Sequence, residues 1–228
     1  MKEKKIVYNG VSLLVNMESD ADASVLNEIF VEREYRILEP IIQNSKGVVV
    51  DIGAHIGLFC LYVRAFNRDV KIYAFEPGSG NFQLLKKNLK RNHFEKNIIA
   101  KNLAVAGEEG TCELYLSPDS HNHSLLKFGT KLGTEKVGAV SLSKILDKTG
   151  VVDLIKMDCE GAEFEIIRSL KKHDFERVKN FYLEYHKYSP ELNEEEIKDI
   201  LMKNSYKVKV LPSHYDRRLG FIFGFSAI

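Results

Sequence analysis

The chain has 228 residues, of which 44% are hydrophobic and 29% are charged, and this composition is typical of a globular protein with one large core. Lys and Arg number 33 and Asp and Glu number 32, and the resulting net charge of +1 excludes a strong overall attraction to nucleic acid or to an anionic membrane. The three cysteines, Cys60, Cys112 and Cys159, are an odd number and lie far apart, which indicates free thiols rather than a disulfide framework.

The sequence predicts a soluble, cytoplasmic protein. Residues 1–5 are basic, but the residues after them alternate between apolar and polar and lack the continuous apolar stretch of a signal peptide. The longest apolar run, residues 48–63, is interrupted by Asp51 and His55 and is too short to span a bilayer.

The first 46 residues are expected to form an extension that precedes the main domain. Two short apolar runs within residues 6–15 flank Asn9-Gly10, a dipeptide that favours the positive φ angles of a tight hairpin turn. Residues 20–44 carry apolar side chains at helical spacing, and Pro40 should break or kink this stretch, which predicts one or two helices.

Residues 47–228 show the alternating pattern of a single α/β domain. The expected strands are residues 48–50, 70–75, 98–105, 152–157 and 180–185, and the expected helices are residues 55–67, 80–92, 141–148, 162–170 and 193–204. This alternation implies right-handed crossovers and a Rossmann-like, doubly wound, mostly parallel sheet. The last two expected strands, residues 206–211 and 220–227, are joined by a turn too short for a parallel crossover, so they should pair antiparallel.

The region between the third and fourth of these strands is less regular. Residues 111–116 are expected to add a β-segment to the fold. Residues 117–138 are rich in Ser, His, Asn and Gly and show little periodicity, which is typical of a functional or mobile loop. We interpret His121, His123 and Ser124 as residues on the substrate side of a site or in a lid over it.

A glycine-rich turn follows the first core strand. Residues 51–57 read Asp-x-Gly-x-x-x-Gly, which places Asp51, Gly53 and Gly57 where a turn lets a ligand approach backbone amides. The spacing differs from the Gly-x-Gly-x-x-Gly of a dinucleotide site, and an acidic Asp51 would repel a pyrophosphate. Asp51 instead suits a cationic ligand, and S-adenosylmethionine carries both a sulfonium and an ammonium group. A strand-to-helix turn with a capping aspartate would explain the same segment without a ligand.

Glu76 ends the second strand, where an acidic side chain can accept hydrogen bonds from both hydroxyls of a ribose. A residue at this place fits proteins that bind a nicotinamide cofactor and proteins that bind S-adenosylmethionine. Pro77 is explained by the end of the strand. Asn102, Leu103 and Ala104 end the third strand and could frame an adenine, although core packing explains Leu103 equally well.

Three carboxylates, Asp158, Glu160 and Glu163, follow the fourth strand at the sheet edge where open α/β proteins bind their ligands. They should repel one another unless a cation, a hydrogen-bonded substrate or a shared proton offsets their charge. A helix N-terminus favours acidic residues for structural reasons, which explains Glu160 and Glu163 as well as catalysis does. Asp158 is therefore the stronger functional candidate.

Glu184 and His186 end the fifth strand and, being two residues apart, should point to the same side of the sheet. There they would face the same cleft as Asp158. A histidine that titrates near neutral pH can accept a proton from a hydroxyl, and a neighbouring carboxylate would orient its ring. A surface histidine without a catalytic role would fit the same pattern.

These segments resemble the FkbM family of S-adenosylmethionine-dependent methyltransferases. The resemblance covers residues 47–190 and rests on residues 50–59, on the run Ile-Lys-Met-Asp-Cys-Glu-Gly-Ala-Glu within residues 155–164, and on residues 183–186. It implies a seven-stranded sheet and methyl transfer to a hydroxyl of a sugar or another small molecule. The residues expected to bind the cofactor are Asp51, Gly53, Ala54, His55, Gly57, Glu76, Pro77, Asn102, Ala104 and Asp158.

Two arrangements of the catalytic residues remain open. In the favoured one, His186 is the general base, Glu184 orients its ring, and Asp158 binds a hydroxyl of the acceptor. In the other, Asp158 and Glu184 hold a Mg²⁺-like cation that lowers the pKa of the hydroxyl. The expected partner in both is a small-molecule or carbohydrate acceptor.

Three further functions compete with this hypothesis. An NAD-type oxidoreductase is favoured by Glu76 but opposed by the missing glycine pattern. A non-catalytic cofactor-binding module would keep the fold and transfer nothing, and the presence of Asp158, Glu184 and His186 together argues against it. Methylation of nucleic acid is weakened by the neutral net charge and by the absence of tryptophan for base stacking.

Overall fold

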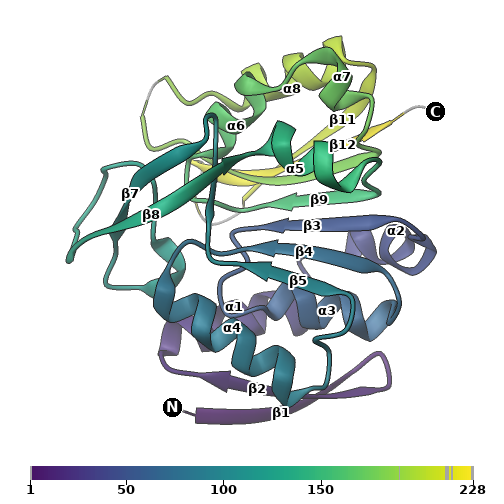
Figure 1. Cartoon of the computed structure of the whole chain (residues 1–228), viewed down its shortest axis with the longest axis vertical. Helices are drawn as coiled ribbons and strands as arrows, with labels where there is room; N and C mark the ends of the chain where they lie inside the picture. The colour runs from purple at the N-terminus through teal and green to yellow at the C-terminus, as the bar shows by residue number, and fades with distance from the viewer. Residues whose placement is uncertain (1, 190, 214–215, 217, 227–228) are drawn as a thin grey trace.

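The centre of the molecule is a seven-stranded sheet with the strand order β11-β12-β10-β9-β3-β4-β5 (Figure 1). The computed structural model describes residues 2–189, 191–213, 216 and 218–226. The parallel strands are β3 (Val48–Ile52), β4 (Lys71–Phe75), β5 (Ile98–Lys101), β9 (Leu154–Met157) and β10 (Asn180–His186), and the antiparallel strands are β11 (Tyr206–Pro212) and β12 (Leu219–Ser226). The predicted mostly parallel sheet with an antiparallel C-terminal pair is confirmed. Residue 227 of the last predicted strand, and residues 214, 215 and 217 of the turn before it, lie outside the described residues.

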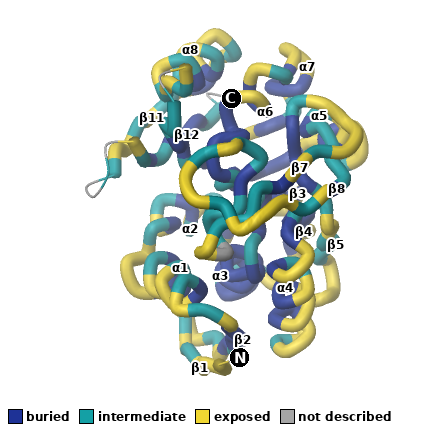
Figure 2. The backbone as a smooth tube through the Cα atoms, turned by 90° about the vertical axis from the view of Figure 1, so that its left-hand side faces the viewer, coloured by how far each residue is buried: buried dark blue, intermediate teal, exposed yellow. Residues whose placement is uncertain are grey.

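Helices cover both faces of this sheet, because successive side chains of a strand point to opposite faces. In β3, Val49 packs into one core, whereas Val48 and Val50 pack into the other. The helices on the first face are α1 (Asp20–Phe30), α2 (Glu39–Asn44), α3 (Leu58–Phe66) and α4 (Ser79–Arg91), and those on the second are α5 (Leu142–Thr149), α6 (Glu163–Ser169), α7 (Lys172–Phe175) and α8 (Glu194–Lys203). Figure 2 shows the result, with buried strands inside and exposed turns outside.

The third predicted strand is divided in two. It ends as β5 at Lys101, and its continuation β6 (Ala104–Ala106) joins a separate three-stranded sheet with β8 (Gly133–Ser141) and β7 (Gly110–Leu116). The predicted loop at residues 117–138 is therefore wrong beyond residue 132, where β8 begins. The alternation that marks a strand is weak in β8 because Val137 is its only fully buried residue. Within the remaining loop a short 3-10 turn, η2 (Ser120–Asn122), lies beside α1.

The N-terminal hairpin has the predicted form. Strands β1 (Lys2–Tyr8) and β2 (Val11–Met17) pair antiparallel around Asn9 and Gly10, whose φ angles are +46° and +75°. Pro40 lies in the first turn of α2, so the region after the hairpin forms two helices, with a 3-10 turn at Arg36–Leu38 between them. Helix α3 begins later than predicted, at Leu58, because the preceding turn holds left-handed residues.

Two further predictions concern the cysteines and membrane insertion. The three cysteines are free, as their number and spacing indicate. In the described part of the chain, no helix combines the length and the apolar character needed to cross a bilayer.

Asn88 of α4 is a buried amide that helps to attach the hairpin to the domain. Its Oδ1 accepts a hydrogen bond from the Asn16 backbone amide at 2.7 Å, and its Nδ2 donates to the carbonyl oxygens of Asn16 and Ile56 at 3.1 and 2.9 Å. Asn88 is completely buried, so water does not replace these bonds. Leu13 and Val15 of β2 belong to the same apolar core as α3.

We expect Asn88→Ala to lower the free energy of unfolding by about 2–4 kcal/mol, because it leaves a buried amide and carbonyl without partners. Denaturant titration measures this loss. The matched control is Gln83→Ala on the exposed side of the same helix, which should change stability by less than about 0.5 kcal/mol. Equal effects of the two substitutions would show that Asn88 does not hold the hairpin in place.

Candidate active site

A cavity of about 950 Å³ lies over the carboxyl ends of β3, β4, β9 and β10. This is the edge at which open α/β sheets bind ligands, and the volume is in the range of small-molecule sites. Because the strands are parallel, the residues that follow each of them meet at this edge. The residues singled out from the sequence are therefore brought together by the topology of the sheet.

Lys156 of β9 is a buried cation at the floor of the site. The register of β3 and β9 places Asp51 directly beside it. The Lys156 ammonium lies 3.6 Å from Asp51 Oδ1 and 3.6 Å from Asp158 Oδ2. Burial lowers the pKa of Lys156, but the carboxylates of Asp158 and Asp51 outweigh it and raise this pKa above the usual range, so the ammonium stays charged. The same ammonium donates a hydrogen bond to the Gly53 carbonyl at 3.0 Å.

The glycine-rich turn satisfies its own backbone amides. The amides of Gly53 and Ala54 both donate to the carbonyl of Phe75, at 3.0 and 2.9 Å. The Gly57 amide donates to Ala54, and the His55 amide donates to a side chain at the end of β4. These four amides therefore have protein partners, and they are not directed at a ligand as the amides of a phosphate-binding loop are.

Gly53 is required by the shape of this turn. Its φ angle is +73°, and a Cβ at this position would lie 1.7 Å from the carbonyl oxygen of Asp158. The loops after β3 and β9 therefore touch through backbone alone at this point. Any larger residue would push the two loops apart.

Glu76 lies buried at the end of β4 and faces the cavity. Its Oε2 accepts the hydrogen bond from the His55 amide at 2.8 Å, and its Oε1 accepts from the Gly78 amide at 2.9 Å. Burial raises the pKa of Glu76, and nearby His55 together with these amides opposes that effect. A carboxylate oxygen can accept more than one hydrogen bond, so this arrangement leaves capacity for donors on a ligand.

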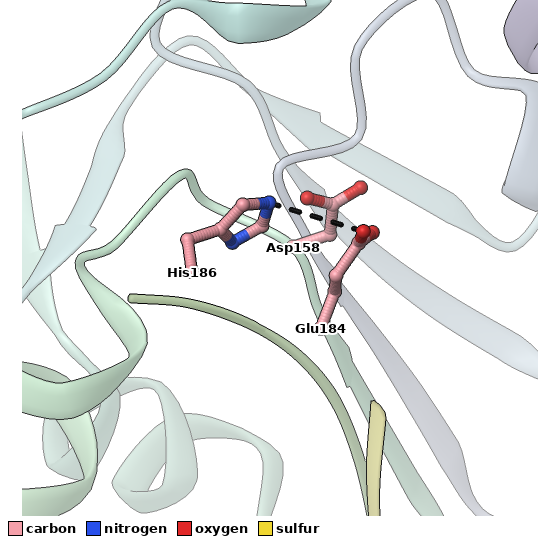
Figure 3. Close-up of side chains that lie close together, drawn as sticks. All are labelled: Asp158, Glu184 and His186. Carbon is pink, nitrogen blue, oxygen red and sulfur yellow. Dashed lines mark ion pairs between the residues drawn. The ribbon is translucent and has the colours of Figure 1, made fainter. Parts of the chain in front are cut away.

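Asp158, Glu184 and His186 converge at the other end of the cavity (Figure 3). One potential ligand atom from each lies within 4.8 Å of the others. His186 Nε2 is 3.9 Å from Glu184 Oε1, so the predicted orienting contact is longer than a hydrogen bond. The ring is held instead by Glu163, whose Oε1 lies 3.1 Å from His186 Nδ1.

Glu163 is a buried support for this group. Its two carboxylate oxygens also accept hydrogen bonds from the backbone amides of Cys159 and Gly161, at 2.9 and 2.8 Å. Glu163 thus has the structural role that was expected of an acidic residue at the start of a helix, because it binds nearby backbone amides. In addition, it fixes the imidazole of His186.

The end of the cavity at Asp158, Glu184 and His186 carries a surplus of carboxylates. Burial raises the pKa of Glu34 to about 7, with a further contribution from Asp158, and burial likewise raises the pKa of Glu160 to about 7. The pKa of Glu184 lies well above its usual range for the same reason. Burial would lower the pKa of His186, but Glu163 and Glu160 hold it well above 6.5. This part of the site therefore favours positive charge and bound protons.

The predicted cofactor residues divide into two groups. Those that line the cavity are Gly53, Ala54, His55, Glu76, Pro77, Ala104 and Asp158. Asp51, Gly57 and Asn102 are not among the described residues that line it. Asp51 is fully buried against Lys156 and Cys60, Gly57 precedes α3 with a φ angle of +86°, and Asn102 donates hydrogen bonds to the carbonyls of Glu76 and Pro77.

Several lining residues were missed from the sequence. Glu34 and Tyr35 come from the segment after α1, and Tyr188 follows β10. Periodicity carries no signal for Glu34 and Tyr188, because each lies in an irregular connection, and it marked Tyr35 only as an apolar residue of the helical spacing in residues 20–44. Of the loop residues considered, His121 and His123 line the cavity, whereas Ser124 is buried and donates its hydroxyl to the Glu160 carbonyl at 2.7 Å.

Known methyltransferases are similar to this chain. A family model described as Methyltransferase FkbM domain matches residues 51–221. The chain is 28% identical over 192 residues to methyltransferase sdnD of Sordaria araneosa. This alignment covers 70% of this chain and 73% of that protein. It is 24% identical over 199 residues to the 31-O-demethyl-FK506 methyltransferase FkbM of Streptomyces tacrolimicus, covering 73% of this chain and 75% of that protein.

The fold has a counterpart among solved structures. Methyltransferase FkbM from Methylobacillus flagellatus superposes with a TM-score of 0.57 and 16% sequence identity. The match covers 78% of this chain and 43% of that chain, so this chain spans less than half of the solved protein. At this identity the similarity shows the fold alone.

A pH-dependent contact supports the end of the cavity at His55 and Glu76. His55 Nε2 lies 3.2 Å from Asp22 Oδ1, and the amides of Glu18 and Ser19 donate to Asp22 Oδ2. Burial raises the pKa of Asp22, but the hydrogen bond from His55 and those two amides outweigh it and hold this pKa well below 3.8. The charged carboxylate therefore stabilises the fold above pH 3.8, and this contribution is lost as the pH falls from 3.8 through the lower folded-state pKa.

We expect Asp22→Asn to lower the free energy of unfolding at pH 7 by about 1–2 kcal/mol, because it removes hydrogen bonds to a charged group. The difference from the unsubstituted protein should shrink as the pH is lowered from 5 to 2.5. Urea denaturation across that range measures it. A difference that stays constant with pH would mean that Asp22 is not ionised in the folded protein.

Proposed function

The chain belongs to the FkbM methyltransferase family, as its motifs predicted, and on that premise we propose that it transfers a methyl group from S-adenosylmethionine to a hydroxyl of a small molecule. A sugar or another polyhydroxylated compound is the class of acceptor that we infer. S-adenosylmethionine, when bound, supplies a methyl group on a positively charged sulfur. The residues of this chain bind it, orient the acceptor and take up the proton of the hydroxyl.

The observation that carries this proposal is the state of the glycine-rich turn. The amides of Gly53, Ala54, His55 and Gly57 are bonded within the protein, so these four amides are not available to bind a pyrophosphate. The buried carboxylate of Glu76 is a polar group at this end of the cavity. A ligand with ribose hydroxyls and no phosphate fits this arrangement. The NAD of an oxidoreductase carries a pyrophosphate and fits it less well.

The acceptor end supports a hydroxyl as the methylated group. A hydroxyl must lose its proton as the new bond to carbon forms, and positioned groups can accept it. Asp158, Glu184 and His186 lie at the cavity wall, where they can bind acceptor hydroxyls and take up that proton. The name of the Streptomyces tacrolimicus relative, which describes a 31-O-demethyl substrate, also supports methylation on oxygen.

We further propose that the loop of residues 117–132 forms a lid over the acceptor. His121 and His123 in it line the cavity, and Phe128 stacks on Tyr188 with ring centroids 3.6 Å apart. A closed lid would exclude water from the reacting groups.

Amide hydrogen exchange in residues 117–132 should slow when S-adenosylhomocysteine and an acceptor are added, because the closed loop protects its amides. Mass spectrometry of proteolytic peptides measures this, with the β1–β2 hairpin as an internal reference. Exchange that is equally slow with and without these ligands would contradict the lid.

Glu76→Gln should weaken the binding of S-adenosylhomocysteine about 10-fold to 150-fold, the equivalent of about 1.5–3 kcal/mol for hydrogen bonds to a charged group. Isothermal titration calorimetry measures the affinity. Glu32→Gln is the matched control, since this glutamate also lines the cavity but belongs to the segment after α1. Unchanged affinity in Glu76→Gln, or binding of NADH by the unsubstituted protein, would refute the assignment.

A further inference from the structure

We propose that Asp158, Glu184 and His186 form a binding site for one divalent metal cation at the acceptor end of the cavity. The site deepens the proposed function and rests on it, because the cation would bind the acceptor hydroxyl. The three residues lie at the ends of β9 and β10, which pair in parallel, so the sheet itself brings them together.

The geometry of the three side chains is that of a ligand set. One atom from each, two carboxylate oxygens and an imidazole nitrogen, lies within 4.8 Å of the others. Figure 3 shows the side chains turned toward a common point. Asp158 and Glu184 are partly exposed and line the cavity, so a cation between these groups is accessible to an acceptor.

The orientation of His186 is an independent indication. The side chain is 3% exposed, and its Nδ1 is held by Glu163 Oε1 at 3.1 Å. This contact fixes the ring and directs Nε2 toward Glu160 and Glu184. Within the described part of the chain Nε2 makes no hydrogen bond, and its nearest carboxylate oxygens lie at 3.6 and 3.9 Å. In a metal-ligating histidine, one ring nitrogen binds the metal and the other is usually held by a carboxylate. Glu163 has this position relative to His186.

The local charge also favours a bound cation. Glu34, Asp158, Glu160 and Glu184 all line this end of the cavity. Lys156 is shared between Asp158 and the buried Asp51, so its single charge does not balance the group. A divalent cation between Asp158 and Glu184 would offset part of this negative charge.

The ligand types indicate which cations fit. Two carboxylates suit hard cations, but an imidazole nitrogen favours Mn²⁺ and later transition metals over Mg²⁺ and Ca²⁺. Three protein ligands also leave coordination positions for an acceptor hydroxyl, whose pKa the cation would lower, and its proton would pass to Glu34, a carboxylate that lines the same cavity and is not a ligand. The structure thus favours the cation arrangement over the one in which His186 alone accepts the proton.

Binding of Mn²⁺ to the full-length protein, after removal of metals with a chelator, tests the site directly. Calorimetry should show one Mn²⁺ per chain, and Asp158→Asn and Glu184→Gln should each weaken this binding at least 10-fold. The control is Glu32→Gln, which removes the same charge from the same cavity and should change the affinity less than threefold. Circular dichroism establishes that each variant is folded.

A spectroscopic measurement identifies the nitrogen ligand. Pulsed electron paramagnetic resonance of bound Mn²⁺ should show coupling to an imidazole nitrogen that is lost in His186→Gln and kept in Glu184→Gln. Absence of stoichiometric Mn²⁺ binding, or nitrogen coupling that persists in His186→Gln, would overturn the site. Calorimetry with S-adenosylhomocysteine on the same samples separates the two proposals. Protein that binds S-adenosylhomocysteine but no Mn²⁺ would refute the cation site alone. Protein that does not bind S-adenosylhomocysteine would refute the proposed function.

Discussion

The arrangement of the site depends on one buried ion pair, that between Lys156 and Asp51. An ammonium and a carboxylate buried in a protein interior are both unfavourable unless they are paired and hydrogen-bonded. The parallel register of β3 and β9 places them side by side, and the Lys156 ammonium also donates a hydrogen bond to the carbonyl of Gly53 and lies 3.6 Å from the carboxylate of Asp158. One side chain thus joins the glycine-rich turn to the loop that carries Asp158.

This link explains why the two ends of the cavity have different chemistry. Near β4, backbone amides and His55 surround Glu76, so a single carboxylate is well supplied with donors. Near β9 and β10, carboxylates outnumber the groups that can neutralise them, and Glu163 is fully occupied in holding His186 and two amides. A ligand with hydroxyls fits the first end, and a ligand that brings positive charge fits the second.

Much of this site follows from the sequence, because the ends of parallel strands are readable as apolar runs followed by polar residues. That reasoning placed Glu76, Asp158, Glu184 and His186 at one edge, and all of them line the cavity. It assigned Asp51 to the ligand, whereas the register buries Asp51 against Lys156, and strand pairing cannot be read from one strand alone. The support of His186 by Glu163 depends on how α6 follows its loop, and the role of Glu34 depends on the packing of an irregular segment, neither of which periodicity records.

The most direct test of the account is a crystal structure of the protein with bound S-adenosylhomocysteine. We expect the ribose hydroxyls to donate hydrogen bonds to Glu76 and the sulfur to face the group formed by Asp158, Glu184 and His186. A ligand whose ribose lies away from Glu76 would contradict the proposed function. So would a ligand that binds anywhere other than in this cavity.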